Sequence, residues 1–374
     1  MKLAYFSPLG PQRSGISDYS EALLPYLAAS AELTLFVDGF QPLNTDLTSR
    51  FEILDYRRKR SLLKDLNRFD AVLYHVGNDH RYHSGILDAM RIRPGIVVLH
   101  DFALQDLFLG LTRERNDFKF YLEEVEACYG RKRRIEVEEE LTRGATPSIV
   151  YRPLEFPLNS RMVNSAEGVI VHSDWARQRL AKIAAGVPIA HIPHLIKFDE
   201  SDRATNHTNA EVRIANFGLI TPGKGIELAL RALSKLKQTH RFKYSLIGEP
   251  NGYYDVRKLI RDYRMDGLVE ISGHVSLDQF LKRMDETDIA LNIRERTVGE
   301  TSGCLCRLMA KGVCSVVADD GWYSELPDDS VVKLPIDNTT DDLLIAYLQR
   351  LIEDQSLRKR IGANAARYVR ATYA

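Results

Sequence analysis

Short apolar runs alternate with helix-like amphipathic stretches along the first half of the chain. The runs have the length of buried strands and lie at residues 2–7, 32–37, 51–56, 71–76 and 96–100. Helical patterns at about 18–29, 59–69 and 82–92 separate them, with Ser17 or Asp18 as the expected cap of the first helix. Strands spaced by helices predict a parallel, doubly wound sheet.

The pattern changes between about residues 103 and 145, where long, charged, amphipathic helical stretches replace the strands. An insertion of this kind usually covers a site or an interface. The strand pattern resumes at 168–172, runs into a helix that starts at Ser173 or Asp174, and returns at 190–193. We therefore expect an N-terminal domain over residues 1–197 that carries a helical insertion at about 103–145.

Residues 198–211 are polar and nearly devoid of apolar side chains, which predicts a linker. A second α/β series follows over residues 212–374. Its expected strands lie near 213–218, 244–249, 268–273, 288–293, 313–318 and 331–334. Its expected helices lie near 226–238, 254–263, 276–283, 302–311, 341–353 and 357–372. The sequence thus predicts an α/β fold with two doubly wound parallel-sheet domains facing a cleft.

Composition fits two globular domains, since the chain has 374 residues, 44% of them hydrophobic and 27% charged. Lys and Arg together number 51, as do Asp and Glu, so the chain has no net positive charge that would attract nucleic acid. Any anion-binding site must therefore be built from a local group of positive or N–H donor groups. The basic runs at 57–60 and 131–134 are the exceptions. Each is either a solvated helix face or a contact with an anionic membrane surface.

Four cysteines show neither a metal-binding pair nor a disulfide framework, which favours a reducing compartment. Pro8 interrupts the N-terminal apolar run, and no run reaches the roughly 18 apolar residues of a membrane span. We therefore expect a soluble, cytoplasmic protein, with peripheral contact at the inner face of the membrane as an option.

Two loops after expected strands of the second domain are candidate ligand sites. In open parallel sheets, ligands bind outside the carboxyl ends of the strands. The loop after 288–293 carries Glu300, Thr301 and Ser302 at that edge, although it could simply be a polar turn that caps the next helix.

The second loop, from Gly218 to Gly225, directs several backbone N–H groups and Lys224 at one space, which suits a diphosphate. A plain surface turn is the alternative. The loop is not a Walker A motif, because Gly225 stands where Ser or Thr is required.

Histidines mark strand ends in the first domain. His100 ends one expected strand, followed by Asp101, and His75 ends the strand before it. A histidine there can donate to or accept from a substrate hydroxyl, or can be purely structural. Together with His172 and His194 these residues look scattered along the chain and show no metal-ligand spacing. No D-x-D triplet is present either, so we expect no metal site.

Five stretches in this order resemble the retaining glycosyltransferases of family 4, which have the two-domain GT-B fold of Rossmann-like domains. The stretches are RSGISDYSEALLPYL at 13–27, LHDF at 99–102, GVIVHSDWARQRL at 168–180, FGLITPGKGIELALRAL at 217–233 and GETSGCLCRLMAKGVCSVVADDGWYSELP at 299–327. Together the stretches span nearly the whole chain.

The resemblance implies transfer of a sugar from a nucleoside-diphosphate sugar, of UDP or GDP type, to a glycan or lipid-linked acceptor. The transfer would retain the anomeric configuration of the sugar and would need no metal or cofactor. The second domain would hold the donor and the first the acceptor. Lys224, with amides near Gly225, would stabilise the leaving diphosphate. Gly15 would let the first loop approach the diphosphate, and His100 would lie beside the reacting sugar.

The chain departs from the family pattern at three positions. The family's two glutamates, eight residues apart, align with Gly299 and Arg307. Glu300 is expected to bind the sugar hydroxyls instead, and Arg307 to contact phosphate or a neighbouring carboxylate. Leu219 replaces a frequent arginine after Gly218.

The sequence therefore predicts a glycosyltransferase acting in assembly of a bacterial surface or secreted glycan. Two alternatives remain, a GT-B nucleotide-sugar epimerase and a non-catalytic GT-B binding module. An epimerase would need a pair of carboxylates able to move a proton, and the sequence shows no obvious pair.

Overall fold

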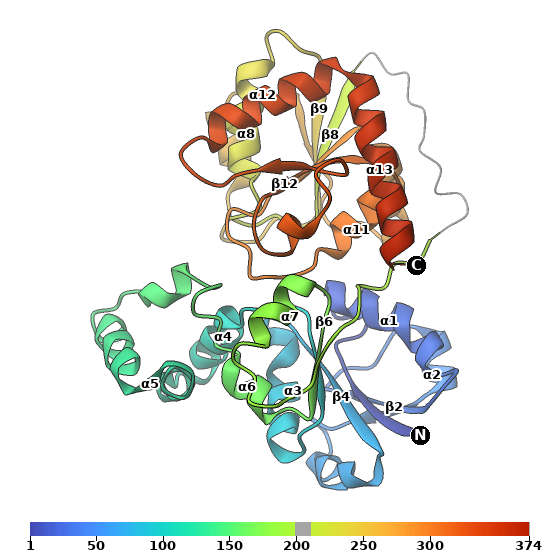
Figure 1. Cartoon of the computed structure of the whole chain (residues 1–374), viewed down its shortest axis with the longest axis vertical. Helices are drawn as coiled ribbons and strands as arrows, with labels where there is room; N and C mark the ends of the chain where they lie inside the picture. The colour runs from blue at the N-terminus through green and yellow to red at the C-terminus, as the bar shows by residue number, and fades with distance from the viewer. Residues whose placement is uncertain (199–210, 374) are drawn as a thin grey trace. The chain divides into compact units, whose positions relative to one another are not determined.

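The computed structural model describes residues 1–198 and 211–373, which form two compact units (Figure 1). The first unit consists of Met1–Leu195 together with the short segment Val298–Thr301, and the second of Ile196–Thr297 together with Ser302–Ala374. The expected linker, 198–211, falls almost entirely outside the described residues. Its boundaries therefore stay a prediction.

The first unit is built on a seven-stranded sheet with the order β3-β2-β1-β4-β5-β6-β7, in which every pairing is parallel. The order reverses between β1 and β4, so this is the point where a doubly wound sheet opens a crevice at its carboxyl edge. The strands are β1 Lys2–Phe6, β2 Glu32–Val37, β3 Glu52–Asp55, β4 Ala71–Val76, β5 Ile96–Leu99, β6 Gly168–Val171 and β7 Ile189–His191.

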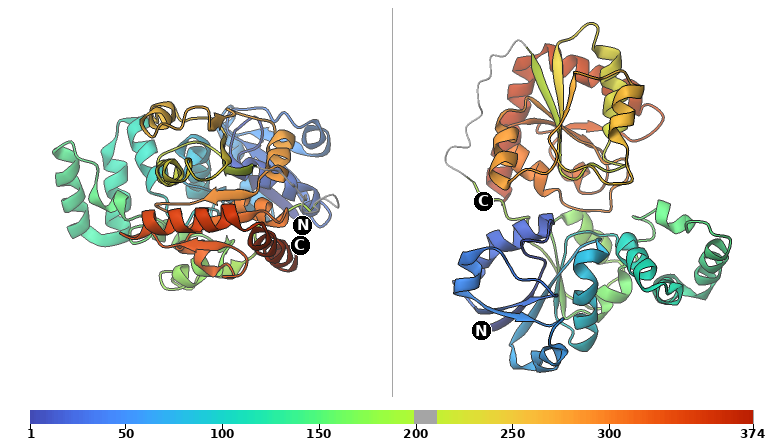
Figure 2. Two further views of the ribbon diagram at one scale, coloured as in Figure 1. Left: turned by 90° about the horizontal axis from the view of Figure 1, so that it is seen from above. Right: turned by 180° about the vertical axis from the view of Figure 1, so that it is seen from behind.

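Helices cover both faces of this sheet (Figures 1 and 2). Alternate side chains of a buried parallel strand point to opposite faces, so Tyr5 and Phe6 of β1 enter different cores. One face is covered by α1 Gly15–Leu27 and α2 Thr45–Arg50. The other is covered by 3-10 helix η1 Arg60–Arg68 and by α3 His80–Ile92, α4 Gln105–Arg115, α5 Phe118–Thr142, α6 Ser160–Ser165 and α7 Asp174–Leu180.

The predicted strands of the first unit are confirmed, whereas three helical details differ. Helix α1 begins at Gly15 because Ser14, not Ser17 or Asp18, caps it, with Ser14 Oγ accepting from Ile16 N at 3.2 Å. Residues 60–68 form a 3-10 helix. The insertion is broken twice: Asn116 adopts a left-handed conformation (φ 50°) at the end of α4 before Asp117 caps α5, and α5 itself is kinked at Gly130, whose φ of 82° and ψ of 171° are not helical.

The second unit contains a six-stranded sheet with the order β10-β9-β8-β11-β12-β13, again with parallel pairings throughout. The order reverses between β8 and β11. The strands are β8 Val212–Phe217, β9 Phe242–Ile247, β10 Val269–Ile271, β11 Ile289–Asn292, β12 Cys314–Ala318 and β13 Val332–Leu334. All six lie where the sequence predicted them, which confirms the expected α/β class with two doubly wound parallel sheets.

Helices flank the second sheet (Figure 1). The apolar faces of α8 Ile226–Leu236, α9 Val256–Asp262 and α12 Thr340–Glu353 build one core. The opposite side is covered by α10 Leu277–Asp285, α11 Gly303–Ala310 and α13 Gln355–Tyr373. Among the described residues, no helix is long and apolar enough to span a lipid bilayer.

Helices α11 and α13 pack with almost no space between their backbones. A Cβ atom placed on Gly362 of α13 would lie 1.8 Å from the carbonyl oxygen of Gly312, which follows α11. The same interface buries Cys306 and Tyr373, and the Trp322 indole donates to the Tyr373 hydroxyl at 3.2 Å. This contact requires glycine at position 362.

Replacing Gly362 by alanine should therefore destabilise the second unit. Overpacking of this kind costs about 1–3 kcal/mol, and the better helix propensity of alanine recovers roughly 1 kcal/mol at most. Gly252→Ala is the matched control, because no atom lies within 4 Å of a Cβ at that position. Thermal unfolding of both variants tests the contact. Equal melting temperatures would show that there is room for a methyl group between α13 and Gly312.

Candidate functional site

Two loops of the second unit meet where the strand order reverses between β8 and β11. The loop after β8 contains residues 218–225, and Glu295 N, from the loop after β11, donates to Gly223 O at 2.9 Å. The Asn216 side chain donates to Lys224 O at 3.2 Å, and the Tyr244 hydroxyl donates to Asn216 Oδ1 at 2.7 Å. Side chains of β8 and β9 thus fix the backbone of Lys224.

The ammonium group of Lys224 lies over Gly218. A Cβ atom placed on Gly218 would be 3.2 Å from Lys224 Nζ and 3.9 Å from Cys304 Sγ. Helix α8 starts directly after Gly225, which is left-handed (φ 65°) and leaves the first amides of the helix without a side-chain cap. One half-buried cation and a set of backbone donors at a helix start form the chemistry of an anion site.

Helix α11 contributes two further predicted residues to this unit. Ser302 is buried, and its hydroxyl accepts from Leu305 N at 3.2 Å, so its side chain caps the helix. Arg307 is half-buried and lies one helical turn beyond Cys304, the residue beside Gly218. The second unit therefore holds Gly218, Lys224, Gly225 and Ser302 in loops and at helix starts, and Arg307 in the last turn of α11.

The segment Val298–Thr301 packs within the first unit. Ala103 N donates to Val298 O at 2.8 Å, directly after the end of β5. Gly299 has φ +76°, and a Cβ there would lie 2.6 Å from Phe102 Cβ and 2.7 Å from the Trp175 ring. These contacts leave no room for a side chain at position 299, so a glutamate could not stand there. The carboxylate of this segment belongs to Glu300 instead.

Glu300 and Asp101 form a pair of interacting carboxylates in the first unit. Glu300 Oε2 accepts from Val298 N at 3.0 Å, and Asp101 Oδ2 accepts from Asn78 N at 2.6 Å. Burial, followed by the negative charge of Glu300, raises the pKa of Asp101 to about 7, against the lowering effect of the Asn78 hydrogen bond. The pair was not apparent in the sequence, because the two residues are 199 positions apart.

The four strand-end histidines converge, so the expectation that they are scattered is wrong. His75 lies at the carboxyl end of β4, and the other three follow β5, β6 and β7, which are neighbours in the sheet. Their rings surround the buried Tyr19. The ring centroids of His75, His100, His172 and His194 lie 5.9, 5.0, 5.2 and 4.7 Å from that of Tyr19. Within the described part of the chain, no group of His, Cys, Asp or Glu is arranged to hold a metal ion.

Burial keeps His75, His100 and His172 neutral. It lowers the pKa of His75 and of His100 well below the usual 6.5, and the neighbouring His172 lowers both further. Burial also lowers the pKa of His172 to about 4, although its hydrogen bond to Ile192 O opposes the shift. Burial lowers the pKa of His83 to about 4 as well, against the opposing effect of its hydrogen bond to the His75 backbone. The cluster therefore provides neutral hydrogen-bonding rings near pH 7.

Gly15 and Thr301 complete the predicted set. Gly15 is exposed at the start of α1, on the carboxyl side of β1, and no atom lies within 4 Å of a Cβ placed on it. Thr301 ends the segment that packs in the first unit. The first unit thus holds Gly15, His100, Glu300 and Thr301, and the convergence of Glu300 with Lys224 of the second unit stays a prediction.

The basic runs are partly neutralised by carboxylates. In the first run, Arg58 pairs with Asp55 at 3.1 Å and Arg60 with Asp88 at 3.4 Å. In the second, Arg133 pairs with Glu136 at 2.5 Å, and Arg134 lies between two further glutamates. These contacts favour solvated, ion-paired surfaces over clusters of open positive charge.

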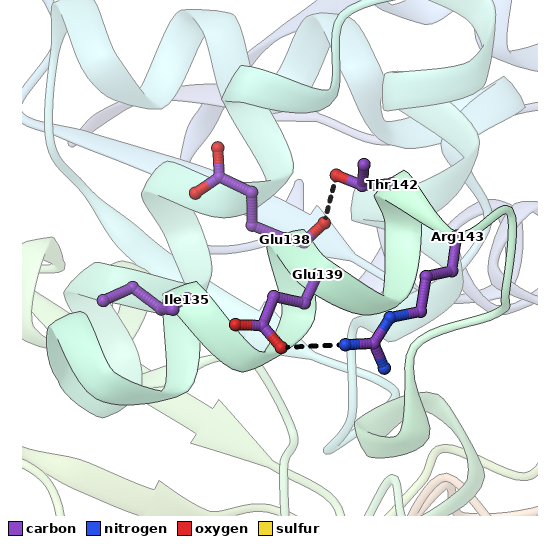
Figure 3. A pocket seen from close by; sticks show the side chains of 5 residues that line it. All are labelled: Ile135, Glu138, Glu139, Thr142 and Arg143. Atoms are coloured by element: carbon purple, nitrogen blue, oxygen red, sulfur yellow. Dashed lines mark hydrogen bonds and ion pairs between the residues drawn. The ribbon is translucent and has the colours of Figure 1, made fainter.

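A surface pocket lies on the insertion helix α5 and is lined by Ile135, Glu138, Glu139, Thr142 and Arg143 (Figure 3). Arg143 pairs with Glu139 at 3.2 Å, and the Thr142 hydroxyl donates to Glu138 O at 2.7 Å. All five residues belong to one stretch of helix and its end, so no groups from other elements converge there. The pocket lacks the features of a catalytic site.

Comparison with known proteins identifies the second unit. Residues 197–368 match the family model described as "Glycosyl transferases group 1". The second unit is thus similar to a glycosyltransferase group 1 domain. No curated protein matches the chain.

Solved structures of glycosyltransferases share the fold of both units. Anabaena HepE, in complex with UDP and glucose, superposes with a TM-score of 0.66 at 16% identity, over 100% of this chain and 95% of its own. Sucrose-phosphate synthase from Thermosynechococcus elongatus gives 0.65 at 13% identity, over 100% and 95%. WaaG gives 0.64 at 13% identity, over 98% and 95%.

These likenesses show the GT-B architecture that the sequence predicted. Together with the glycosyltransferase group 1 domain, they support a glycosyltransferase enzyme.

Acidification should destabilise the first unit. Unfolded histidines take up protons at about pH 6.5, whereas the buried ones resist protonation, so stability falls as pH drops from about 7 to 5, by up to roughly 1.4 kcal/mol per pH unit for each group. Asp101 has the opposite sign, because its raised pKa favours the native state as pH falls, and burial raises the pKa of Asp38, Asp106 and Glu124 in the same direction. These carboxylates offset part of the histidine contribution.

Denaturant unfolding at a series of pH values measures this slope. His172→Phe should flatten the slope, since one depressed pKa is removed from the cluster. An unchanged slope between pH 7 and pH 5 in the folded His172→Phe variant would contradict the assignment of a neutral, buried His172.

Proposed function

We propose that the chain is a retaining, metal-independent glycosyltransferase of family 4. It moves a sugar from a nucleoside-diphosphate donor, of UDP or GDP type, to a glycan or lipid-linked acceptor in the assembly of a bacterial surface or secreted glycan. The observation that carries the proposal is the pair of loops at the strand-order reversal of the glycosyltransferase group 1 domain, with Lys224 Nζ above Gly218.

In this proposal Lys224 and the uncapped amides at the start of α8 stabilise the negative charge that develops on the leaving diphosphate. The lysine is half-buried, which strengthens its interaction with an anion relative to a fully solvated one. Arg307, one turn beyond Cys304 on α11, adds a second cation for a phosphate group.

Glu300 and His100 would contact the transferred sugar. The close packing of Gly299 against Phe102 and Trp175 fixes the backbone that precedes Glu300, which limits the positions that its carboxylate can take. His100 is half-buried and ends β5 in the same unit, and a neutral imidazole can bind a sugar hydroxyl without an ionic partner.

The compared structures agree with this donor class. HepE structures hold UDP, UDP with glucose, or UDP-glucose, and WaaG is a glycosyltransferase involved in lipopolysaccharide biosynthesis. We infer a donor and a role of the same kind for this chain.

A lipid-linked acceptor would also involve the basic runs. Arg131 and Lys132 are exposed on α5, whereas Arg133 and Arg134 are engaged by glutamates. Peripheral contact with an anionic lipid surface at the cytoplasmic face would therefore rely on the exposed pair.

Lys224→Ala should weaken nucleotide binding and transfer together. Loss of one charge-assisted contact to the diphosphate corresponds to roughly a 10- to 100-fold loss of affinity for UDP or GDP. Glu300→Gln should instead lower the transfer rate, while UDP binding stays near that of the wild type. Calorimetry with UDP, GDP and dTDP, alongside transfer and donor-hydrolysis assays, measures both effects.

Matched controls lie close to each site. Lys235 is exposed at the far end of α8 and Glu295 is exposed in the loop after β11, so Lys235→Ala and Glu295→Gln should retain wild-type activity. Full activity in the folded Lys224→Ala and Glu300→Gln variants would refute the site. A wild-type protein that binds no nucleotide at millimolar concentration would instead be a non-catalytic GT-B module.

The carboxylate pair favours nucleotide-sugar epimerisation as a second candidate. Asp101 and Glu300 interact electrostatically, and a carboxyl group with a pKa of about 7 can give or take a proton near neutral pH. Incubation of UDP- and GDP-sugars without acceptor separates the two activities, since an epimerase converts the donor alone and Asp101→Asn would abolish that conversion. Unchanged or merely hydrolysed donor favours the transferase.

A further inference from the structure

A direct hydrogen bond joins two histidine rings at the carboxyl edge of the first sheet. His75 Nδ1 and His100 Nε2 are 2.9 Å apart, with the rings nearly stacked at a centroid distance of 5.2 Å. Their strands, β4 and β5, are neighbours with the register His75 opposite Val98, so the backbone itself brings the rings together. Because His100 Nε2 is engaged by His75, a ligand meets the other nitrogen, Nδ1.

Both rings are neutral, which leaves two possible arrangements of the protons. In the first, His75 carries its proton on Nδ1 and donates it to His100 Nε2, so that His100 carries its own proton on Nδ1. In the second, His100 donates from Nε2 to His75 Nδ1, and His75 then carries its proton on Nε2. The two arrangements give His100 Nδ1 opposite roles, as a donor or as an acceptor.

The surroundings of His75 favour the first arrangement. His75 is fully buried, and its Nε2 atom has no hydrogen-bond partner within the described residues. A proton on that atom would be a buried donor without an acceptor, which is rarer and more costly than a buried lone pair. Tyr5, whose ring centroid lies 4.7 Å away, offers only the weak acceptor of an aromatic face.

Neighbouring rings of the cluster already follow the same pattern. His83 Nδ1 donates to His75 O at 3.1 Å, and His172 Nδ1 donates to Ile192 O at 2.8 Å. A carbonyl oxygen can only accept, so both of these rings carry the proton on Nδ1. His172 Nε2 is also buried without a partner in the described part of the chain, as a lone pair.

We propose that His75 is a positioning residue, which holds His100 in the tautomer with the proton on Nδ1 and so makes that nitrogen a hydrogen-bond donor to an oxygen of the bound sugar. The role of His100 at a sugar rests on the proposed glycosyltransferase function. The tautomer itself does not, because it follows from the His75–His100 contact and the burial of His75. A neutral donor suits a sugar hydroxyl, which always has lone pairs to offer.

The direct test is nitrogen-15 NMR of the full chain labelled at histidine, near pH 7.5. The His100 signals are assigned by their loss in His100→Gln. We expect the protonated-nitrogen shift at Nδ1 and the bare-nitrogen shift at Nε2 in the wild type. His75→Phe removes the donor to Nε2 and should move His100 towards a mixture of tautomers, whereas His172→Phe, which removes another ring of the cluster, should leave His100 unchanged.

Kinetics provide a second readout. His75→Phe should lower kcat by roughly 3- to 10-fold, the effect of one hydrogen bond between neutral groups, with little change in the donor KM. His75→Asn should restore most of the rate, since its amide nitrogen can donate from nearly the position of Nδ1. This rescue also keeps the test valid if His75→Phe does not fold.

Each outcome decides the proposal. A wild-type His100 protonated on Nε2 overturns it, as does a folded His75→Phe variant with an unchanged tautomer and unchanged kcat. If the wild type transfers no sugar from any nucleoside-diphosphate donor, the proposed function fails, while the NMR experiment still decides the tautomer.

Discussion

Parallel strand pairing is the constraint on which both candidate sites depend. It brings the carboxyl ends of all strands in a sheet to one edge, so residues that are far apart along the chain meet there when each follows a different strand. Where the strand order reverses, between β1 and β4 and between β8 and β11, consecutive helices leave to opposite faces and open space at that edge. The anion-type loop around Lys224 and the histidine cluster around Tyr19 are both products of this geometry.

The pattern of apolar runs was sufficient to predict nearly every strand and the α/β class. Strands that are buried on both faces consist mainly of apolar residues and therefore stand out in the sequence. It placed the start of α1 three residues too late, since the Ser14 side chain competes with Ser17 and Asp18 for the cap and sequence alone does not rank them. It also missed the break at Asn116, where one left-handed residue separates two helices.

Site chemistry was harder to predict than the fold. Lys224 was found because its glycine-flanked turn is a local signal, and the structure confirms the position of the turn between β8 and α8. The Asp101–Glu300 interaction depends on the return of the Val298–Thr301 segment to the first unit, for which the sequence carries no local signal. The histidine cluster had a usable signal, one histidine at or shortly after the carboxyl end of each of four strands, but its meaning required the strand order.

The Val298–Thr301 segment has a consequence for how the protein is made. The rest of the first unit ends at Leu195, so its contact with Ala103, Phe102 and Trp175 has to wait until more than a hundred further residues have left the ribosome. Long-range contacts of this kind form late, because the intervening chain must first be closed into a loop. The edge that holds His100 and Asp101 is therefore completed only after β8, β9, β10 and β11 have been synthesised, and the carboxylate pair cannot form while the first 195 residues are alone.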